Sequence, residues 1–358
     1  MSDNHDSEAL ESGRPVTQQD VAERAGVSRA VVSYVVNDGP RVVSPETRAR
    51  VLKAIEELGY RPNKHAQRLK RQPEQRASGQ IGIVFGGDSK ILERPYFSAT
   101  LAGIYRAARQ QRQQIRFVSF FDELNDPVFF NRNIHPEEIS GLIIVATDLV
   151  MREQYAAELL ERITARLPRV ISLEHVIPGL PAVVFDRVGA ARMAVTHLIQ
   201  LGHTRIGYAG GHDNRLEGYR QALLEHGLPF DEALLGVPGP LHEPQDGSRA
   251  ARELMALPQP PTGIFATSDE VAIGVLAALH DLGVRVPQDV ALVSIDDITL
   301  AAYTRPALTT VHVPKESFGI YALQMLAMHG DLPAEQPASV VLPTKLVIRE
   351  SCGARLAQ

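Results

Sequence analysis

The 358-residue sequence has one cysteine, Cys352, and no tryptophan. A single cysteine excludes a disulfide within the chain and any metal site built from several cysteines, and it is typical of a reducing compartment. Without tryptophan, a platform that stacks on a flat ligand has to use phenylalanine or tyrosine. No apolar run reaches the roughly 18 residues that a membrane-spanning helix requires. We therefore expect a cytoplasmic protein that makes no contact with a membrane.

The sequence also lacks the common short motifs of catalysis. It contains no G-x-S-x-G, P-loop or H-E-x-x-H, and "FGGDSK" (85–90) lacks the G-x-G-x-x-G spacing of a dinucleotide site. His197 and His203 are six residues apart, which is not the i, i+4 spacing of a zinc pair on a helix. Cys352 lies in a polar tail, with no companion that would indicate a nucleophile. We predict a protein that is not an enzyme, with no catalytic residue, metal site or cofactor.

Charge is distributed unevenly along the chain. Residues 1–13 carry a net charge of −4, residues 14–76 carry +6, and residues 77–358 carry −7. The acidic start has no basic region or apolar core, so we expect a disordered tail over 1–15 and no secretory signal. A basic block ahead of a larger acidic body is typical of a nucleic-acid-binding module joined to another domain. A balance of this size is also common on a solvated surface.

The basic block contains three short helical patterns. The first begins at Thr17, which forms a capping box with Asp20, and ends at Gly26, where we expect a positive φ. The second lies in "GVSRAVVSYVVN" (26–37), which has five valines and by composition favours a strand. Its valines recur every four residues rather than every two, so we predict a helix with Ser28 as its N-cap. A short turn between two such helices is typical of a helix-turn-helix.

The third pattern is "SPETRARVLKAIEELGY" (44–60), in which Ser44 caps the helix, Pro45 occupies its first turn and Gly59 ends it. On the second helix, the polar side chains lie on or beside the face opposite the valines, where they can reach bases or phosphates; an ordinary solvated face is the alternative. We predict DNA contacts in this head at Thr17, Gln18, Gln19, Ser28, Arg29, Ala30, Ser33, Tyr34, Asn37, Ser44, Thr47 and Tyr60.

These segments resemble one family closely. "VTQQDVAERAGVSRAVVSYVVN" and "VSPETRARVLKAIEELGYRPNKHAQRLK" are similar, almost position by position, to the LacI/GalR family of bacterial transcriptional regulators. The resemblance implies a homodimer that binds operator DNA and responds to a small molecule. The family often has threonine at the position of Val31 and arginine at that of Tyr34. Because Tyr34 falls on a base-reading position, the operator sequence cannot be transferred from a known member.

The resemblance also assigns a role to the basic, proline-punctuated segment that follows. In the family, such a hinge folds when two copies meet on DNA, and a leucine from each wedges into the minor groove. The matching residue is Leu69, with Ala66 on the same face and Asn63 near the start. The alternative is a disordered linker that happens to contain one leucine.

The rest of the chain alternates apolar, β-rich runs with amphipathic helical stretches. Strands are predicted at 81–86, 116–121, 141–146, 169–174, 182–186, 205–211, 262–269 and 291–297, and helices at 96–112, 151–166, 189–201, 215–227, 247–257 and 269–283. This order predicts parallel sheets with helices on both faces, and the number of elements indicates two lobes. The fold class is therefore an all-α helix-turn-helix head plus an α/β two-lobed core. The resemblance implies that this core is periplasmic-binding-protein-like.

The predicted domains follow from this pattern. They are a tail (1–15), the DNA-binding head (16–62), the hinge helix and linker (63–79), an N-lobe (80–185 plus about 312–340) and a C-lobe (186–311 plus 341–358) that also carries the dimer contact. No leucine heptad follows Glu350, so we expect no C-terminal tetramerisation coil.

Ligands of open α/β sheets bind beyond the carboxyl ends of the strands. Acidic side chains with one arginine at those ends suit a hydroxyl-rich ligand, although acids there commonly cap the following helix. "RLEGYRQAL", "SDEVAIG" and "SIDD" also match effector-contacting segments of the family. Tyr96 and Phe97 could equally belong to a lobe core. The predicted effector contacts, in the cleft between the lobes, are Tyr96, Phe97, Glu174, Phe185, Arg215, Ser268, Asp269 and Asp296.

We therefore predict a sequence-specific DNA-binding regulator, a homodimeric repressor of a pseudo-palindromic operator, controlled by a sugar or sugar derivative. The rival is a sugar-binding protein or α/β enzyme with an incidental basic extension. A periplasmic receptor would need an export signal and an enzyme would need a catalytic constellation, and we find neither.

Overall fold

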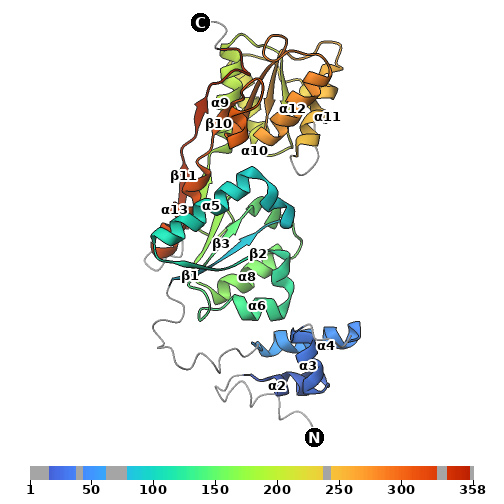
Figure 1. Cartoon of the computed structure of the whole chain (residues 1–358), viewed down its shortest axis with the longest axis vertical. Helices are drawn as coiled ribbons and strands as arrows, with labels where there is room; N and C mark the ends of the chain where they lie inside the picture. Colours follow the sequence, from blue (N-terminus) through green and yellow to red (C-terminus); the bar gives the residue numbers. More distant parts are fainter. Residues whose placement is uncertain (1–15, 38–42, 62–78, 237–242, 329–336, 355–358) are drawn as a thin grey trace. The chain divides into compact units, whose positions relative to one another are not determined.

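The computed structural model describes residues 16–37, 43–61, 79–236, 243–328 and 337–354. The first two ranges form three helices: α2 (Gln18–Ala25), α3 (Arg29–Asn37) and α4 (Pro45–Leu58) (Figure 1). The predicted capping box is present, since the Thr17 hydroxyl accepts from the N–H of Asp20 and the Asp20 carboxylate accepts from the N–H of Thr17. Gly26 ends α2 with φ 64°, a conformation that favours glycine. The predicted starts of the three helices, and the predicted ends of α2 at Gly26 and of α4 at Gly59, are confirmed.

The valines of α3 form the core of this head. Val32, Val35 and Val36 are buried, and Val27 and Val31 pack against the same cluster at partial exposure. Their partners include apolar side chains of α2 and α4. β-branched side chains are compact and stiff, so three short helices can approach closely around them. The periodicity, and not the strand propensity of valine, decided the local structure.

The remainder of the chain forms two compact units, one built mainly on each of two six-stranded sheets. The first sheet has the strand order β11-β5-β4-β3-β1-β2, and β1 pairs in parallel with β2 and β3. Its strands are β1 (Gln80–Phe85), β2 (Gln114–Phe120), β3 (Gly141–Val145), β4 (Val170–Glu174), β5 (Ala182–Phe185) and β11 (Ser339–Leu342). Its helices are α5 (Pro95–Gln110), α6 (Pro127–Asn133), α7 (Thr147–Val150), α8 (Ala156–Arg166) and α13 (Lys315–Met328).

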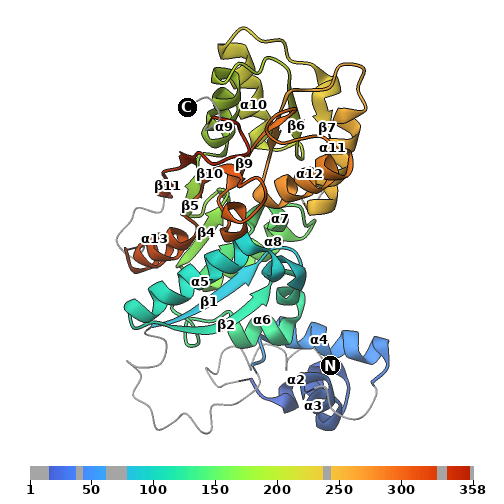
Figure 2. The same ribbon diagram turned by 45° about the horizontal axis from the view of Figure 1, so that its top comes forward.

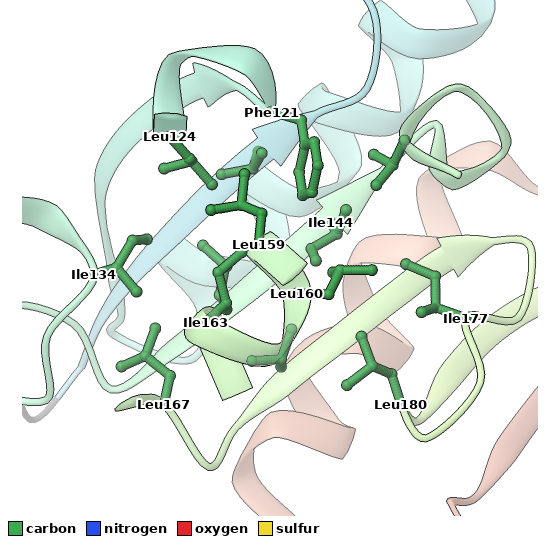
Figure 3. Close-up of a cluster of buried hydrophobic side chains, with 14 of the residues drawn as sticks. Phe121, Leu124, Ile134, Ile144, Leu159, Leu160, Ile163, Leu167, Ile177 and Leu180 are labelled. Atoms are coloured by element: carbon green, nitrogen blue, oxygen red, sulfur yellow. The ribbon is translucent and has the colours of Figure 1, made fainter. Parts of the chain in front are cut away.

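One face of the first sheet carries the apolar core shown in Figure 3. Leu159, Leu160 and Ile163 of α8 lie over Ile144 of β3, and Phe121 and Leu124 follow β2 into the same cluster. The strands β3 and β4 are buried at every residue, as expected for parallel strands covered on both faces.

The second sheet has the order β12-β10-β9-β8-β6-β7, parallel except for the antiparallel pair β10 and β12. Helices α9 and α10 cover one face and α11 and α12 the other (Figure 2). Its strands are β6 (Ile206–Ala209), β7 (Leu235–Gly236), β8 (Gly263–Ala266), β9 (Ala291–Asp296), β10 (Thr309–His312) and β12 (Lys345–Val347). Its helices are α9 (Arg187–Gln200), α10 (Asn214–Glu225), α11 (Pro244–Met255) and α12 (Asp269–Asp281).

All eight predicted strands and all six predicted body helices are present, with ends shifted by a few residues. The helix predicted at 151–166 begins only at Ala156, because residues 151–155 form turns. The elements that we did not predict include α6, α7 and β7, which are too short to show a periodic pattern. No range was predicted for β10, β11, β12 and α13 either. We assigned residues from about 341 to the second lobe, and the second unit does resume at Val340, although β11 (Ser339–Leu342) pairs with the first sheet.

The first unit also includes the three-helix head. Asn131 of α6 donates through Nδ2 to the carbonyls of Ile55 (3.2 Å) and Tyr60 (3.4 Å), and its Oδ1 accepts from Arg166 (2.6 Å). Arg61, just after α4, forms salt bridges with Glu137 and Glu138. Asn131 thus links the end of α4 to α6, as a further donor to the Ile55 carbonyl, which also accepts from the N–H of Tyr60.

Candidate DNA-binding surface and effector site

The outward face of α3 carries the predicted base-reading side chains. Ser28, Arg29, Ala30 and Asn37 are exposed, whereas Ser33 and Tyr34 are half-buried. Within the described residues, Arg29 makes no hydrogen bond or ion pair, so its guanidinium is available to an external partner. Asn37 donates to the carbonyl and hydroxyl of Ser33, which occupies its amide on the helix itself. The exposed start of α3 thus presents a small residue next to a free cation, as a helix entering the major groove requires.

Other predicted DNA contacts also have structural roles in the head. Thr17 is the N-cap of α2 and Ser44 is the N-cap of α4, where its hydroxyl accepts from the N–H of Thr47. Tyr60 is buried in the head core rather than on its exposed face, and a hydrogen bond links it to Gln18. Gln19 is exposed and bonded to Glu23. Three further predicted contacts, Asn63, Ala66 and Leu69, lie outside the described residues.

In the second unit, the predicted arginine lies at the point where the strand order reverses. The chain runs from β6 to β7 on one side of β6 and then returns to β8 on the other, which is the topological switch point where ligands of open sheets bind. Gly210 directly follows β6 there, and a Cβ at this residue would lie 1.9 Å from Cγ2 of Thr267. Arg215 of α10 donates through Nη1 to the Thr267 carbonyl (2.8 Å). The close approach of the two strand ends therefore positions the buried guanidinium.

Asp296 ends β9 at the same edge of this sheet. Only 6% of it is exposed, and no donor among the described residues is hydrogen-bonded to its carboxylate. Burial raises the pKa of Asp296 to about 6, while Lys315 and Arg215 oppose the shift. Its φ of 121° and that of Asp297, 56°, are conformations that non-glycine residues rarely adopt. Strained backbone of this kind clusters at functional sites.

Lys315, which we did not predict, holds this turn in place. Its buried ammonium donates to the backbone carbonyls of Asp296, Asp297 and Val313. Burial lowers the pKa of Lys315, and Asp296 is the largest of the opposing charges. The ammonium therefore stabilises the turn that carries Asp296, whose carboxylate accepts no hydrogen bond from the described residues.

Ser268 caps the following helix, which is the alternative that we gave for these strand ends, whereas Asp269 is hydrogen-bonded within the core. Ser268 is the N-cap of α12 and accepts from the N–H of Val271. The fully buried carboxylate of Asp269 accepts from the hydroxyls of Ser294 and Thr310 and from the N–H of Ile298. Its hydrogen bonds are internal, so it positions the ends of β9 and β10.

Two of the predicted aromatic residues are buried, and residues 92–103, which contain them, group with the second unit and not with the N-lobe to which we assigned them. Tyr96 and Phe97, at the start of α5, form an edge-to-face pair with ring centroids 5.1 Å apart. Arg94 lies over the Phe97 ring and forms a salt bridge with Glu270 of α12 (3.0 Å). Arg94 and Glu270 are therefore further charged residues near this edge that sequence reasoning missed.

Phe185 and Glu174 end two neighbouring strands of the first sheet. Phe185 is buried, and the guanidinium of Arg187 lies 4.8 Å from its ring centroid. Glu174 is buried with φ 75°, and its Oε2 accepts from the N–H of Ala146 at the end of β3 (3.1 Å). Glu174 thus joins the ends of β3 and β4 by a hydrogen bond.

A cavity of about 460 Å³ lies elsewhere in the second unit. Its lining includes Leu276, His280, Arg285, Arg305 and Pro306. These residues surround the C-terminal end of α12, whereas Ser268 and Asp269 begin that helix. Because ligands of this sheet type bind at the carboxyl ends of the strands, we assign the effector site to the edge with Arg215 and Asp296.

One prediction about Cys352 is wrong. The residue is buried, and its Sγ lies 3.4 Å from Nε2 of His197 and 3.2 Å from the hydroxyl of Thr309. The tail is covered because Ser351 hydrogen-bonds to Leu292 and Thr309 of two adjacent strands. Burial lowers the pKa of His197, so this is a neutral packing contact. Within the described residues, no group of three or more potential metal ligands comes together.

A further finding of the fold concerns the membrane. No helix in the described ranges is both long and apolar enough to span a bilayer.

A helix-turn-helix head followed by two parallel α/β units with charged residues at their strand ends defines a DNA-binding protein with a small-molecule-binding core. Comparison with known proteins agrees. Residues 17–63 match the model of the bacterial regulatory proteins of the lacI family, and residues 195–352 match the periplasmic binding protein-like domain. The chain belongs to the LacI family and is a DNA-binding transcriptional regulator.

The relatives cover most of the chain. The transcriptional regulator GalS of Salmonella typhimurium is 34% identical over 88% of this chain and 90% of its own length. Catabolite control protein A of Priestia megaterium is 30% identical over 94% and 99%. Among solved structures, the complex of the transcriptional regulator CelR with cellobiose is 29% identical with a TM-score of 0.67, and covers 94% of this chain and 100% of CelR. A LacI family regulator from Enterococcus faecium with bound ribose is 25% identical with a TM-score of 0.62, over 76% and 98%.

Proposed function

We propose that this regulator is a repressor that binds a pseudo-palindromic operator as a homodimer, and that a sugar or sugar derivative controls its affinity for DNA. The proposal of an effector site rests on Asp296, a buried carboxylate that accepts no hydrogen bond from the described residues. A buried carboxylate without a donor is costly unless a ligand supplies one. A sugar hydroxyl is such a donor.

The neighbouring groups support a hydroxyl-rich ligand. Carboxylates accept hydrogen bonds from sugar hydroxyls, and a guanidinium donates in a fixed fork. Two related regulators were solved with cellobiose and with ribose, which supports the same class. We propose contacts to the effector from Tyr96, Phe97, Glu174, Phe185, Arg215, Ser268 and Asp296, with Asp269 as the residue that positions the strand ends.

The proposal of operator binding rests on α3 and on the hinge. We propose that Arg29, Ala30 and Tyr34 read the operator and that Leu69 is the minor-groove wedge, within a head at 16–62 and a hinge at 63–79. A relative named as a repressor, PurR of Escherichia coli, is 31% identical over 94% of this chain, which supports repression. Because two-fold protein symmetry matches two-fold half-sites, a homodimer would bind a palindrome. The effector would act by binding one conformation of the regulator more tightly than the other.

Selection on random-sequence DNA tests the proposal. The purified full-length chain should enrich a two-fold symmetric site, and gel shifts should show affinity for that site falling steeply with salt. A thermal-shift screen of sugars and purines then identifies the effector, because a ligand at 100 times its dissociation constant adds about 2.7 kcal/mol of stability. Enrichment of no palindrome, with or without the ligands that raise the melting temperature, would contradict the proposal.

A further inference from the structure

The guanidinium of Arg215 is already paired with a carboxylate two residues earlier in the chain. Its Nε lies 3.1 Å from both carboxylate oxygens of Asp213, and its Nη2 lies 2.5 Å from Oδ2. Its Nη1 donates to the carbonyl of Thr267. Every nitrogen of the guanidinium therefore has an acceptor inside the protein. Burial alone would lower the pKa of Arg215, but Asp213 raises it, so the pair is a buried cation with its own anion.

Two other cations whose charges act on Asp296 are occupied as well. Arg94 is bonded to Glu270, and the ammonium of Lys315 is held by three backbone carbonyls. Asp296, by contrast, is an acid with no hydrogen-bond donor among the described residues. The edge thus has an unused acceptor, and the three cations whose charges act on Asp296, namely Arg215, Lys315 and Arg94, are already bonded. An anion placed beside Arg215 would meet the carboxylate of Asp213, whereas a hydroxyl group can donate to Asp296.

We infer that Asp213 is a specificity-determining residue, which neutralises Arg215 and so excludes phosphorylated and carboxylated ligands from the effector site. This inference rests on the proposed function, because it assumes that Arg215 and Asp296 contact the effector. The ligand that fits is an uncharged, hydroxyl-rich molecule. Arg215 still has one N–H on each terminal nitrogen with which to donate to a hydroxyl oxygen.

Asp213 and Arg215 are paired within one short segment at the start of α10. Asp213 is the N-cap of α10, and its Oδ1 also accepts from the N–H of Arg215 (2.8 Å). The same carboxylate therefore caps the helix and holds the guanidinium of its second residue. Asn is as good an N-cap as Asp, so Asp213→Asn removes the charge and keeps the cap.

The test compares the affinities of neutral sugars with those of their own phosphate esters. The full-length chain and its Asp213→Asn variant are titrated calorimetrically with ribose and ribose 5-phosphate, glucose and glucose 6-phosphate, and galactose and galactose 1-phosphate. The wild type should bind at least one neutral sugar about tenfold or more tightly than its ester, since one uncompensated charge contact is worth about 1.4 kcal/mol or more. Asp213→Asn should reduce the ratio of the affinity for the neutral sugar to the affinity for its ester about tenfold.

The matched control is Asp231→Asn. Asp231 caps a short helix through the N–H of Ala233 and pairs with Arg205 (3.0 Å), so it reproduces the chemistry of Asp213 elsewhere in the same unit. This variant should leave the ratio unchanged. An unchanged ratio in Asp213→Asn, or a wild type that prefers an ester, would overturn the role of Asp213 and leave the proposed function intact. A wild type that binds none of the six compounds would count against both.

Discussion

The hydroxyl of Thr310 donates to Oδ1 of Asp269 across 2.6 Å and thereby ties strand β10 to the first residue of α12. Ser294 of β9 donates to the same oxygen, and the N–H of Ile298 donates to the other. One buried carboxylate thus gathers two strand ends and the loop after β9. Burial and the nearby Asp296 raise the pKa of Asp269 to about 7, although its three donors oppose the shift.

This geometry predicts how stability depends on pH. Asp269 and Asp296 have folded-state pKa values of about 7 and about 6, above their ordinary value of 3.8, so the folded pair binds protons more tightly than the unfolded chain. The free energy of unfolding should therefore fall as the pH rises from about 4 to about 7, by at most about 1.4 kcal/mol per pH unit for each proton. Urea unfolding at several pH values measures this slope.

Two matched variants test whether Asp296 contributes to this pH dependence of the free energy of unfolding. Asp296→Asn should reduce the slope without abolishing it, because the amide does not titrate whereas Asp269 still does. Asp289→Asn should not, because Arg285 holds the pKa of Asp289 at about 2, below this pH window. An unchanged slope in Asp296→Asn would mean that Asp296 does not contribute to it.

Arg29→Ala should weaken binding to DNA and leave the head folded. Arg29 is exposed and makes no bond among the described residues, so its removal costs the fold little. If it contacts a phosphate, the dependence of log affinity on log salt should decrease by about one; if it contacts a base, operator affinity should drop by about 1–3 kcal/mol. Arg24→Ala is the control, because Arg24 in the same head is paired with Glu57. Gel shifts on operator and random DNA should separate the two variants.

Leu69→Ala should reduce affinity for the operator by roughly tenfold or more, because a minor-groove wedge stabilises a kinked site. Affinity for random DNA should hardly change. This loss should exceed the loss of non-specific binding in Arg29→Ala. Gln67→Ala, two residues earlier, is the control and should retain operator affinity. Equal losses on operator and random DNA would contradict the wedge.

Cys352 offers a probe of the second unit. Its thiol is 2% exposed, so an aromatic disulfide reagent should label it only when the unit opens. A ligand at about 100 times its dissociation constant should slow labelling roughly 100-fold if the opening releases the ligand. Labelling in native buffer is followed spectrophotometrically, with Cys352→Ala as the blank. Immediate labelling of the folded protein would show that the thiol is accessible.

Local patterns predicted the elements well because they depend on near neighbours. The capping box of Thr17 and Asp20 and the four-residue spacing of the valines specify helices within one or two turns. The strands likewise follow from β-branched runs. The partner of a short strand depends on the whole fold, so β11 could not be assigned to the first sheet from "VVLPTK" alone.

The candidate site was predicted in part. Arg215 and Asp296 could be predicted from their positions near the ends of predicted strands, because parallel strands bring their carboxyl ends to one edge of the sheet. The partner of Arg215 could have been found, since Asp213 is two residues away and is a good helix cap. Lys315 could not, because its three carbonyls come together only after β9, β10 and α13 have packed. Cys352 was misjudged for the same reason: a polar tail gave no sign that it would lie across two strands.

Lys315 has one more consequence for the molecule. Its ammonium donates to three carbonyl oxygens around the turn after β9. Because Lys315 is the first residue of α13, these hydrogen bonds join the start of α13 to that turn. That helix starts in the second unit, and from Gly319 onward it belongs to the first. Any rotation of α13 about its start would therefore pull directly on the backbone that carries Asp296. The turn that carries Asp296 and the helix that runs from the second unit into the first are therefore connected through the ammonium of Lys315.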